Sequence, residues 1–302
     1  MPKVAHPTQH SEHGLATHYI PSARVPMLLE NLAALEKPTY AQVNDTIEDL
    51  HYDREPTDPV TPLTGAIRVA LDSAFSQGTV EGIIAALQTF TTNDSDVDVA
   101  QWAKDTLAIL EERSPTSLKI ALTAIRKGRL LDLLDSFKME LGIAAALCVS
   151  SLVDSLLYGR LTTSQHGVSP DLHTGVTSVL QKVAGRPAWS PASLDQVEVA
   201  SVEASFFKPD ANSPQLIFPE ALRNSHPPLA SFLRYGLPSE DELQALVEGR
   251  HASSGSGALT LRELITKFED LRGGKHGVAR KVQEVVGRRC TADKDGYLEW
   301  RH

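Results

Sequence analysis

The stretch Ser114-Pro115-Thr116-Ser117-Leu118-Lys119, together with the run that follows it to Leu147, decides the fold of this chain. Ser114 suits an N-cap, and Pro115 suits the first helical position because its φ is preset and it has no N–H to leave unpaired. Gly128 can supply a left-handed stop. Two apolar stripes at helical spacing flank that glycine: Leu118, Ala121, Leu122 and Ile125, then Leu130, Leu133, Leu134, Phe137, Leu141 and Ala145. We therefore predict a helical hairpin with an apolar seam.

Signals for helix starts recur through the rest of the chain. Thr79 is a predicted cap, and five pairs with capping-box spacing are Thr39 with Gln42, Asp98 with Gln101, Ser193 with Gln196, Ser239 with Glu242, and Thr260 with Glu263. Residues 14–20 are too few for a helix before Pro21 and are predicted to form a strand. The tract Ser253–Gly257 is typical of a flexible joint and should divide off a terminal helical module. The fold class predicted from these signals is mainly α.

The totals exclude several classes of protein. The 302 residues are 41% hydrophobic, enough for a sizeable core, and the net charge of −9 disfavours a surface that grips nucleic acid everywhere. Cys148 and Cys290 cannot make a disulfide framework or a zinc site alone, so a reducing compartment is expected. No apolar run reaches membrane-spanning length, and residues 1–6 resemble neither a signal nor a transit peptide.

Short words in a fixed order carry a family resemblance. They include the Ser114 hexad, K-M-E at 138–140, G-L-A-T-H-Y at 14–19, T-V-E at 79–81, G-V at 175–176 and W-S-P-A at 189–192. The sequence resembles the C-terminal half of 3-hydroxyisobutyryl-CoA hydrolase, a mitochondrial family in the crotonase (enoyl-CoA hydratase/isomerase) superfamily. The extension beyond Phe207 is similar to that of fungal relatives.

The resemblance implies a fold and its borders. Residues 1–13 would be a disordered leader, residues 14–207 the C-terminal helical half of the hydrolase domain, and residues 208–302 a helical extension with a basic tail. The parallel-sheet core of the crotonase fold would be missing, which should leave apolar surface exposed. The family connects Glu140 and Asp171 by a much shorter segment, so the irregular insertion at 148–170 is either a surface loop or a retained intron.

The resemblance also implies a chemistry that this sequence does not carry. Crotonase-type hydrolysis needs backbone N–H groups around the thioester oxyanion and a carboxylate that activates water or attacks. In the family these groups precede the word at 14–19, whereas here thirteen residues precede it, with Glu12 as their one acid. No catalytic residue is therefore assigned, and no cofactor beyond the coenzyme A that the substrate carries. Lys119 is the candidate for contact with a CoA phosphate, against the simpler interpretation of a solvated lysine.

Other candidate sites have simpler explanations. His6, His10 and His13 have helix-like spacing but lack a fourth ligand at suitable spacing, so no metal site is predicted. Asp293-Lys294-Asp295-Gly296 favours a tight turn over a calcium loop. Residues 272–277 (R-G-G-K-H-G) could cradle a phosphate, although a turn between helices is favoured. His18, Trp102 and Trp189 are expected to be packed side chains.

The basic tail suggests a second function. Residues 267–289 hold seven basic and three acidic side chains, a plausible RNA-phosphate patch or a solvated mixed-charge face. The candidate RNA contacts are Lys275, Arg280, Lys281, Arg288 and Arg289.

Three functional interpretations remain open. The chain derives from a hydrolase of acyl-CoA thioesters in valine breakdown and is inactive by itself, or it is a crotonase-like subunit of the small mitochondrial ribosomal subunit, or it is a truncated gene fragment. The resemblance implies a mitochondrial protein without a membrane partner. No targeting segment is recognised in the chain.

Overall fold

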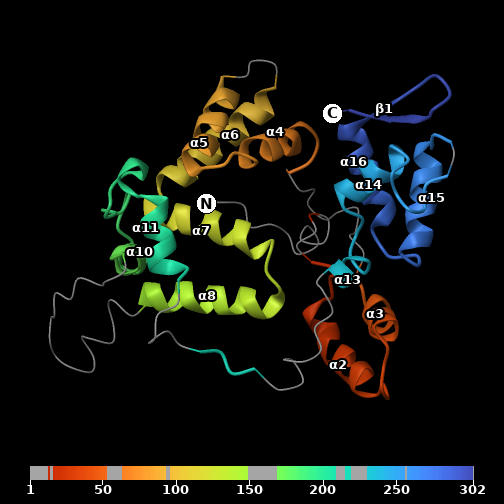
Figure 1. Ribbon diagram of the computed structural model, residues 1–302, viewed down its shortest axis with the longest axis horizontal. Helices are drawn as coiled ribbons and strands as arrows, with labels where there is room; N and C mark the ends of the chain where they lie inside the picture. Colours follow the sequence, from red (N-terminus) through yellow and green to blue (C-terminus); the bar gives the residue numbers. More distant parts are fainter. Residues whose placement is uncertain are drawn as a thin grey trace. The chain divides into compact units, whose positions relative to one another are not determined.

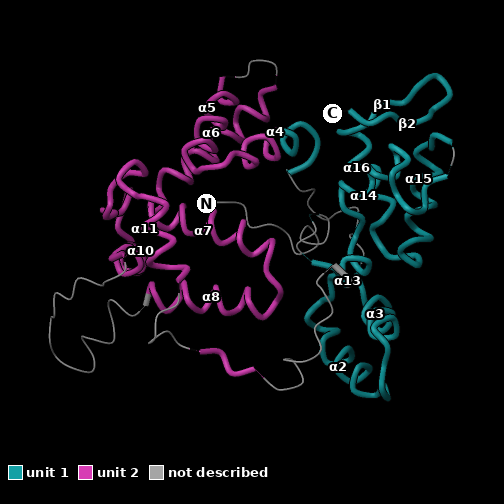
Figure 2. Tube along the Cα trace, in the orientation of Figure 1, with its two compact units in different colours: residues 1–69, 227–302 teal, residues 70–226 magenta. Residues whose placement is uncertain are grey.

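The computed structural model describes residue 13 and residues 16–52, 63–92, 96–148, 169–208, 215–218, 230–255 and 257–301. Two compact units make up the chain (Figure 2). One comprises Met1–Val69 with Pro227–His302, and the other comprises Ala70–His226. The boundaries of these units differ from the domain boundaries expected between residues 13 and 14 and between residues 207 and 208. Residues 16–52 belong to the same unit as the C-terminal extension. The insertion at 149–168 and the leader at 1–12 lie outside the described residues.

The unit of residues 70–226 is helical (Figure 1). The first helix, α4 (Gly65–Phe75), crosses the border of the unit. The others are α5 (Val80–Thr91), α6 (Val97–Glu111), α7 (Pro115–Gly128), α8 (Leu133–Cys148), α10 (Asp171–Leu180), η2 (Leu194–Gln196) and α11 (Val199–Phe206). Helices α4, α5 and α6 share one core, built on Ala74, Ile83, Leu87, Ala103 and Leu107. A second core joins α7, α8 and α11 through Ile120, Ile143, Val197, Val202 and Phe206.

The other unit combines two regions distant in sequence. Its elements are η1 (Ser22–Arg24), α2 (Val25–Ala33), α3 (Tyr40–Glu48), α13 (Ala230–Leu233), α14 (Glu240–Val247), α15 (Leu261–Leu271), α16 (Val278–Arg289), β1 (Cys290–Ala292) and β2 (Leu298–Trp300). β1 and β2 pair antiparallel with Thr291 opposite Glu299. The hydrophobic cluster of this unit lies in the extension and includes Leu243, Leu264, Phe268, Val282 and Val285. Leu50, in the N-terminal part of the unit, is buried as well, at 7% exposed. We call residues 237–301 the extension module.

Most predicted helix starts are confirmed. Capping boxes are present at Thr39, Ser239 and Thr260, and Thr79 and Ser114 cap α5 and α7. These caps are local hydrogen bonds between a side chain and a backbone N–H three residues on, so the sequence alone specifies them. Residues 293–296 form the tight turn between β1 and β2, as predicted, with Gly296 at φ 86°.

Two predicted caps are wrong. The cap of α6 is Asp96, which accepts from the backbone N–H groups of Asp98 and Val99, so the helix begins one residue before the predicted cap. Ser193 makes no capping bond, because the side chain of Gln196 instead accepts from the backbone N–H of Ala192.

Two predictions of local conformation are also wrong. Gly128 is the last helical residue of α7, and the chain continues through Arg129 with right-handed backbone angles. The strand predicted over 14–20 is not found in residues 16–20, the part of it that the structure describes. The sequence reading also missed the hairpin of β1 and β2.

Two predictions about packing need correction. The buried face of α7 carries Thr116, Lys119 and Ile120, whereas Ile125 of the predicted stripe is 75% exposed. The tract 253–257 does not separate a module, because Leu243 and Leu246 before it share a core with Leu264 and Phe268 after it. Within the described residues, no helix combines the length and apolar character needed to cross a membrane.

Candidate functional site

The Ser114 motif forms a buried polar junction at the N-terminus of α7. The Ser114 hydroxyl accepts a hydrogen bond from the backbone N–H of Ser117, 3.1 Å away, and donates one to Oδ2 of Asp171. Oδ1 of Asp171 accepts from the backbone N–H of Ser190 at 2.9 Å. Ser114 and Asp171 are only 4% and 3% exposed. The junction therefore ties the starts of α7 and α10 to the segment before Pro191 through one carboxylate.

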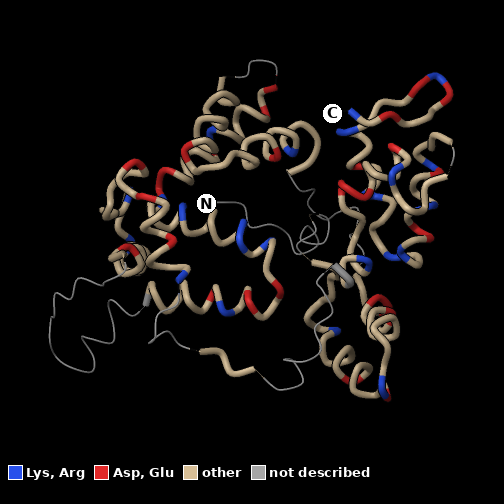
Figure 3. The backbone as a smooth tube through the Cα atoms, in the orientation of Figure 1, with Lys and Arg blue, Asp and Glu red and all other residues tan. Residues whose placement is uncertain are grey.

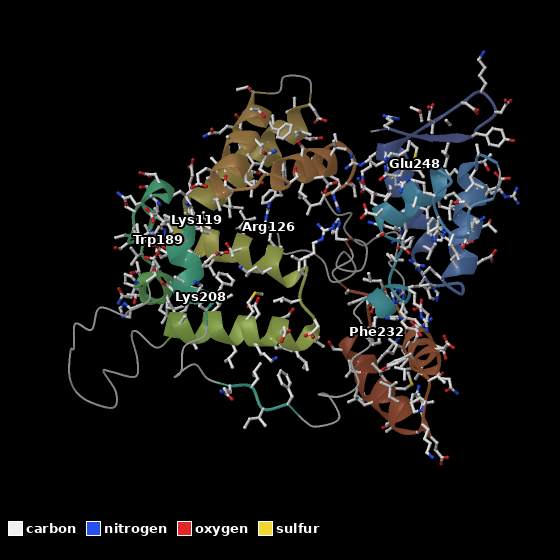
Figure 4. The ribbon with its side chains drawn as sticks, in the orientation of Figure 1. Lys119, Arg126, Trp189, Lys208, Phe232 and Glu248 are labelled. Atoms are coloured by element: carbon white, nitrogen blue, oxygen red, sulfur yellow. The ribbon has the colours of Figure 1, made fainter. Side chains whose placement is uncertain are left out.

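Lys119 is buried, which corrects the expectation of a solvated lysine (Figure 4). Its Nζ lies 2.6 Å from Oε1 of Glu81 and donates to the backbone oxygen of Val197 at 2.7 Å. Partial burial raises the pKa of Glu81, but the hydrogen bond and charge of Lys119, with hydrogen bonds from a backbone N–H and from Thr79, together outweigh burial and leave that pKa below its usual value. The ammonium thus holds α5, α7 and the segment before α11 together, because a buried charge needs such partners.

The tryptophans are packing residues, as predicted. The Trp189 indole N–H donates to the backbone oxygen of Glu112 at 3.0 Å (Figure 4). A Cβ on Gly175 would lie 3.3 Å from the Trp189 ring, so glycine lets α10 approach the indole closely. Trp102 packs against the core of α5 and α6.

The loop 272–277 binds an anion that belongs to the chain itself, the carboxylate of Glu48. Nζ of Lys275 lies 2.7 Å from Oε2 of Glu48, and the backbone N–H of His276 donates to Oε1 at 2.8 Å. Nε2 of His18 also lies 2.7 Å from Oε2, although this nitrogen has no partner in hydrogen-bond geometry. We call these four residues, Glu48, Lys275, His276 and His18, the Glu48 clasp. It joins the segment 16–52 to the extension module.

The electrostatics of the Glu48 clasp favour the charged pair. Burial raises the pKa of Glu48, but His18, Lys275 and the His276 N–H together hold it well below its usual 4.5. Desolvation lowers the pKa of Lys275, opposed by its bond to Glu48. The His51 ring stacks on His276 with centroids 5.3 Å apart, and its Nδ1 accepts from the backbone N–H of Tyr19 at 3.2 Å. Residues 272–277 join α15 to α16, which confirms the predicted turn between helices.

The other predicted RNA contacts lie on α16, where Figure 3 marks the basic and acidic positions along the backbone. Arg288 and Arg289 bind carboxylates of the extension module. Nε of Arg288 donates to Glu284 at 2.8 Å, its Nη2 donates to Glu240, and Nε of Arg289 lies 2.5 Å from the same Glu240. Burial lowers the pKa of Lys281. Burial also acts to lower the pKa of Arg288, but the bonds to Glu240 and Glu284 together outweigh it, so the pKa of Arg288 is raised. Arg280 is exposed. The basic tail is therefore largely an internal ion-pair network.

No metal-binding cluster is found in the part of the chain that the structure describes. No group of three His, Cys, Asp or Glu side chains is placed to hold a metal ion there. Of His6, His10 and His13, only His13 is described, and its Nδ1 lies 3.5 Å from Nη1 of Arg68. Cys290 is buried, and burial raises the pKa of its thiol to about 11. Such a thiol is a poor nucleophile near neutral pH.

Sequence reasoning missed the acidic partners of the predicted cations. Glu81 stood in a word that carried the family resemblance, so its presence was a usable signal, although its bond to Lys119 was not. Glu48 gave no signal, since it lies 227 residues from Lys275 in the chain. Lys119 belongs to the unit 70–226, and the candidate RNA contacts belong to the other unit.

Comparisons with known proteins identify the family. The enoyl-CoA hydratase/isomerase family profile matches residues 5–206. The small ribosomal subunit protein mS47 of Neurospora crassa is 31% identical over 299 residues, which cover 95% of this chain and 53% of the relative. The mitochondrial 3-hydroxyisobutyryl-CoA hydrolase-like protein 1 of Arabidopsis thaliana is 33% identical over 218 residues, 70% of this chain and 47% of that protein.

A solved structure was also matched. The carnitinyl-CoA dehydratase of Mycobacterium thermoresistibile shares 25% identity, with a TM-score of 0.43 over 68% of this chain and 48% of that one. The chain spans about half the length of the curated relatives it matches. Because the family profile covers two thirds of the residues, this chain belongs to the enoyl-CoA hydratase/isomerase family.

Proposed function

We propose that this chain has a structural role as a crotonase-like protein of the small mitochondrial ribosomal subunit, of the mS47 type. The observation that carries the proposal is the extent of similarity. The match to Neurospora crassa mS47 covers 95% of the chain, so it includes most of the extension beyond residue 206, where the family profile ends. Matches to hydrolases cover 61–70% of the chain. A mitochondrial location follows from the same relatives and is part of the proposal.

The geometry of the family-matched residues supports a structural role. Among the described residues of the unit 70–226, the buried charged side chains are Asp171 and Lys119, and each binds hydroxyl, backbone or carboxylate groups of neighbouring elements. An attacking or general-base carboxylate must instead reach the substrate. The described residues thus use their buried ionisable groups to fix helices together.

Sedimentation of truncated and complete chains tests the proposal. A tagged complete chain expressed in mitochondria should sediment with the small ribosomal subunit, and a chain ending at Gly236 should not. The matched control is a chain carrying Phe75→Ala, which changes an exposed side chain outside the extension. Equal recovery of the complete and truncated chains would contradict a role for the extension, and absence of both from the subunit would contradict the proposal itself.

A second candidate is hydrolysis of an acyl-CoA thioester in valine catabolism. Several similar proteins carry the name 3-hydroxyisobutyryl-CoA hydrolase, among them the mitochondrial human and chicken proteins at 29% and 27% identity. If the chain has this activity, Lys119 would contact a CoA phosphate, and it would first have to break its ion pair with Glu81. We expect no turnover of 3-hydroxyisobutyryl-CoA by this chain alone. Measurable turnover of this substrate, with a KM that the substitution Lys119→Met raises, would favour the hydrolase function.

A further inference from the structure

Two loops of the extension module fit the same frame of twelve residues. A calcium-binding EF-hand loop lies between two helices, with a glycine at position 6 for a sharp turn and a glutamate at position 12. Residues 252–263 run from the loop after α14 into the first turn of α15, with Gly257 at position 6 and Glu263 at position 12. Residues 291–302 follow α16 and place Gly296 at position 6. Gly296 has φ 86°, a left-handed angle that glycine adopts without strain.

The contact between the two loops is an independent check of these frames. The backbone N–H of Leu298 donates to the backbone oxygen of Leu259 at 2.8 Å, and Thr260 and Tyr297 form an antiparallel bridge. Leu259 and Leu298 are both at position 8 of their frames, so the contact is centred on the same position in each loop. Leu298 is buried in the core of the extension module, and Leu259 packs against that core. The glycines alone define the frames, and the backbone pairing agrees with them.

The first loop lacks the ligands that calcium needs. Calcium takes about six to eight oxygen ligands, with carboxylates among them. Residues 252–263 contain a single acid, Glu263, and positions 1, 3 and 5 hold an alanine and two serines. The Glu263 carboxylate accepts from the backbone N–H and from the hydroxyl of Thr260, each at 2.8 Å. This capping box fixes the start of α15 without an ion.

The second loop uses its oxygen atoms for bonds within the loop. Asp293 and Asp295 are at positions 3 and 5, but position 1 is a threonine and position 12 is a histidine. Oδ1 of Asp293 accepts from the backbone N–H groups of Asp295 at 2.9 Å and Tyr297 at 2.8 Å. The backbone oxygen of Tyr297 is at position 7, where an EF-hand loop supplies a calcium ligand, and it accepts from the N–H of Asp293 at 2.9 Å. These bonds close the loop into the hairpin of β1 and β2.

We propose that the extension module is an EF-hand-type pair in which hydrogen bonds within the loops have replaced calcium, so that the module stays closed with or without the ion. In sensor proteins, calcium opens such a pair and exposes an apolar groove. Here Leu264, Phe268 and Val282 are fully buried, and both loops are held by their own side chains and backbone. A module that needs no ion to stay closed suits a permanent structural contact. The inference concerns the chain itself and does not depend on the proposed ribosomal function.

Thermal unfolding of the purified complete chain in calcium tests the first half of the proposal. The Tm should be the same in about 1 mM calcium chloride, in magnesium chloride and in EGTA at equal ionic strength. An EF-hand site of sensor affinity, with a Kd of about 10⁻⁷–10⁻⁵ M, would raise the Tm at this calcium concentration, because the ion would bind the folded chain. A Tm raised by calcium and not by magnesium would overturn the proposal.

Restoration of the two missing ligands tests the frame. Thr291→Asp/His302→Glu supplies carboxylates at positions 1 and 12, and up to about 10 mM calcium should raise its Tm more than magnesium does, with a Kd of roughly 10⁻⁴–10⁻³ M. Ala292→Asp/Lys294→Gln is the matched control, since it makes the same change in net charge at positions 2 and 4, which are not ligand positions.

Further substitutions separate a restored site from a general attraction for cations. Addition of Asp295→Ala to the restored variant should abolish the response, because it removes the ligand at position 5. If the restored variant fails to fold, His302→Glu compared with Lys294→Gln carries the same test. A response no greater than that of the charge-matched control, or one that survives Asp295→Ala, would overturn the assignment of an EF-hand frame. Sedimentation with the ribosomal subunit is measured separately, so failure of the proposed function remains distinguishable.

Discussion

The extension module and the helices around the Ser114 motif differ in how many large apolar side chains they leave exposed. In the extension module Leu243, Leu264 and Phe268 are fully buried. In the unit 70–226, several large apolar side chains of α7, α8, α10 and their adjoining turns are mostly exposed, namely Ile125, Leu130, Leu133, Phe137, Val179 and Leu180. The first region has a closed core of its own, and the second presents apolar surface of the kind that marks an interaction site.

The comparison also separates two ways of holding elements together. The extension module relies on apolar burial, whereas α7 and α10 meet through the carboxylate of Asp171. Burial is non-directional and needs no particular partner, while a buried carboxylate is stable only with its donors in place. Substitution of Phe268 should therefore act through lost volume, and substitution of Ser114 through lost hydrogen bonds.

The largest expected effect is on the core of the extension module. Phe268→Ala should lower the free energy of unfolding by about 3–5 kcal/mol, because it leaves a cavity among fully buried neighbours. Ile125→Ala, at a side chain 75% exposed, should change it by less than about 0.5 kcal/mol. Urea unfolding followed by circular dichroism measures both. Similar losses for the two variants would mean that the regions do not differ as described.

Removal of the Ser114 hydroxyl should have a smaller effect. Ser114→Ala deprives Asp171 of a donor in a site 3% exposed, and it also removes the cap of α7, at a combined cost of about 1–3 kcal/mol. Thr79→Ala is the matched control, since it removes an exposed cap from α5 at a cost of about 1 kcal/mol. An equal loss in the two variants would show that the bond to Asp171 adds nothing.

Acid should weaken the Glu48 clasp by a still smaller amount. The folded state depresses the pKa of Glu48, so its stabilising contribution is complete above the usual pKa of 4.5 and declines as the pH falls below it. Glu240 and Glu242 have lowered pKa values as well, so some acid dependence should remain in any variant. Urea midpoints across that range should fall less steeply for Glu48→Gln than for the wild type. Parallel curves would contradict the role of Glu48.

The smallest expected effect is the slow alkylation of Cys290. Its thiol is buried and its pKa is raised to about 11, so iodoacetamide should label it slowly at neutral pH. Phe268→Ala should accelerate labelling by opening the same core. Peptide mass spectrometry of the residue after timed labelling measures the rate. Fast labelling of the wild type would show that the core of the extension module opens readily.

Local features of the fold could be predicted, and the choice of packed faces could not. The caps at Thr39, Ser114, Ser239 and Thr260 depend on atoms within three residues, so the sequence specified them. For α7, the periodicity favoured the face of Leu118 and Ile125. The structure buries Thr116, Lys119 and Ile120 because α5, α8 and α11 pack on that side and Glu81 neutralises the lysine.

The candidate sites show the same limit. The sequence pointed to Lys119 and to the loop 272–277 as places where a phosphate could bind. It could not show that Glu81 and Glu48 bind these cations, because the partners are distant in sequence, with Glu48 and Lys275 227 residues apart. Charge counts along the tail likewise suggested an open basic patch, whereas Arg288 and Arg289 face Glu240 on another helix.

The structural role is tested most directly by the sedimentation of the complete wild-type chain in mitochondrial extract, with thioesterase activity measured in the same fractions. The account predicts that the chain moves with the small ribosomal subunit and that its fractions do not turn over 3-hydroxyisobutyryl-CoA above background. Recovery of the chain only among free matrix proteins, with thioester cleavage following the chain, would contradict it.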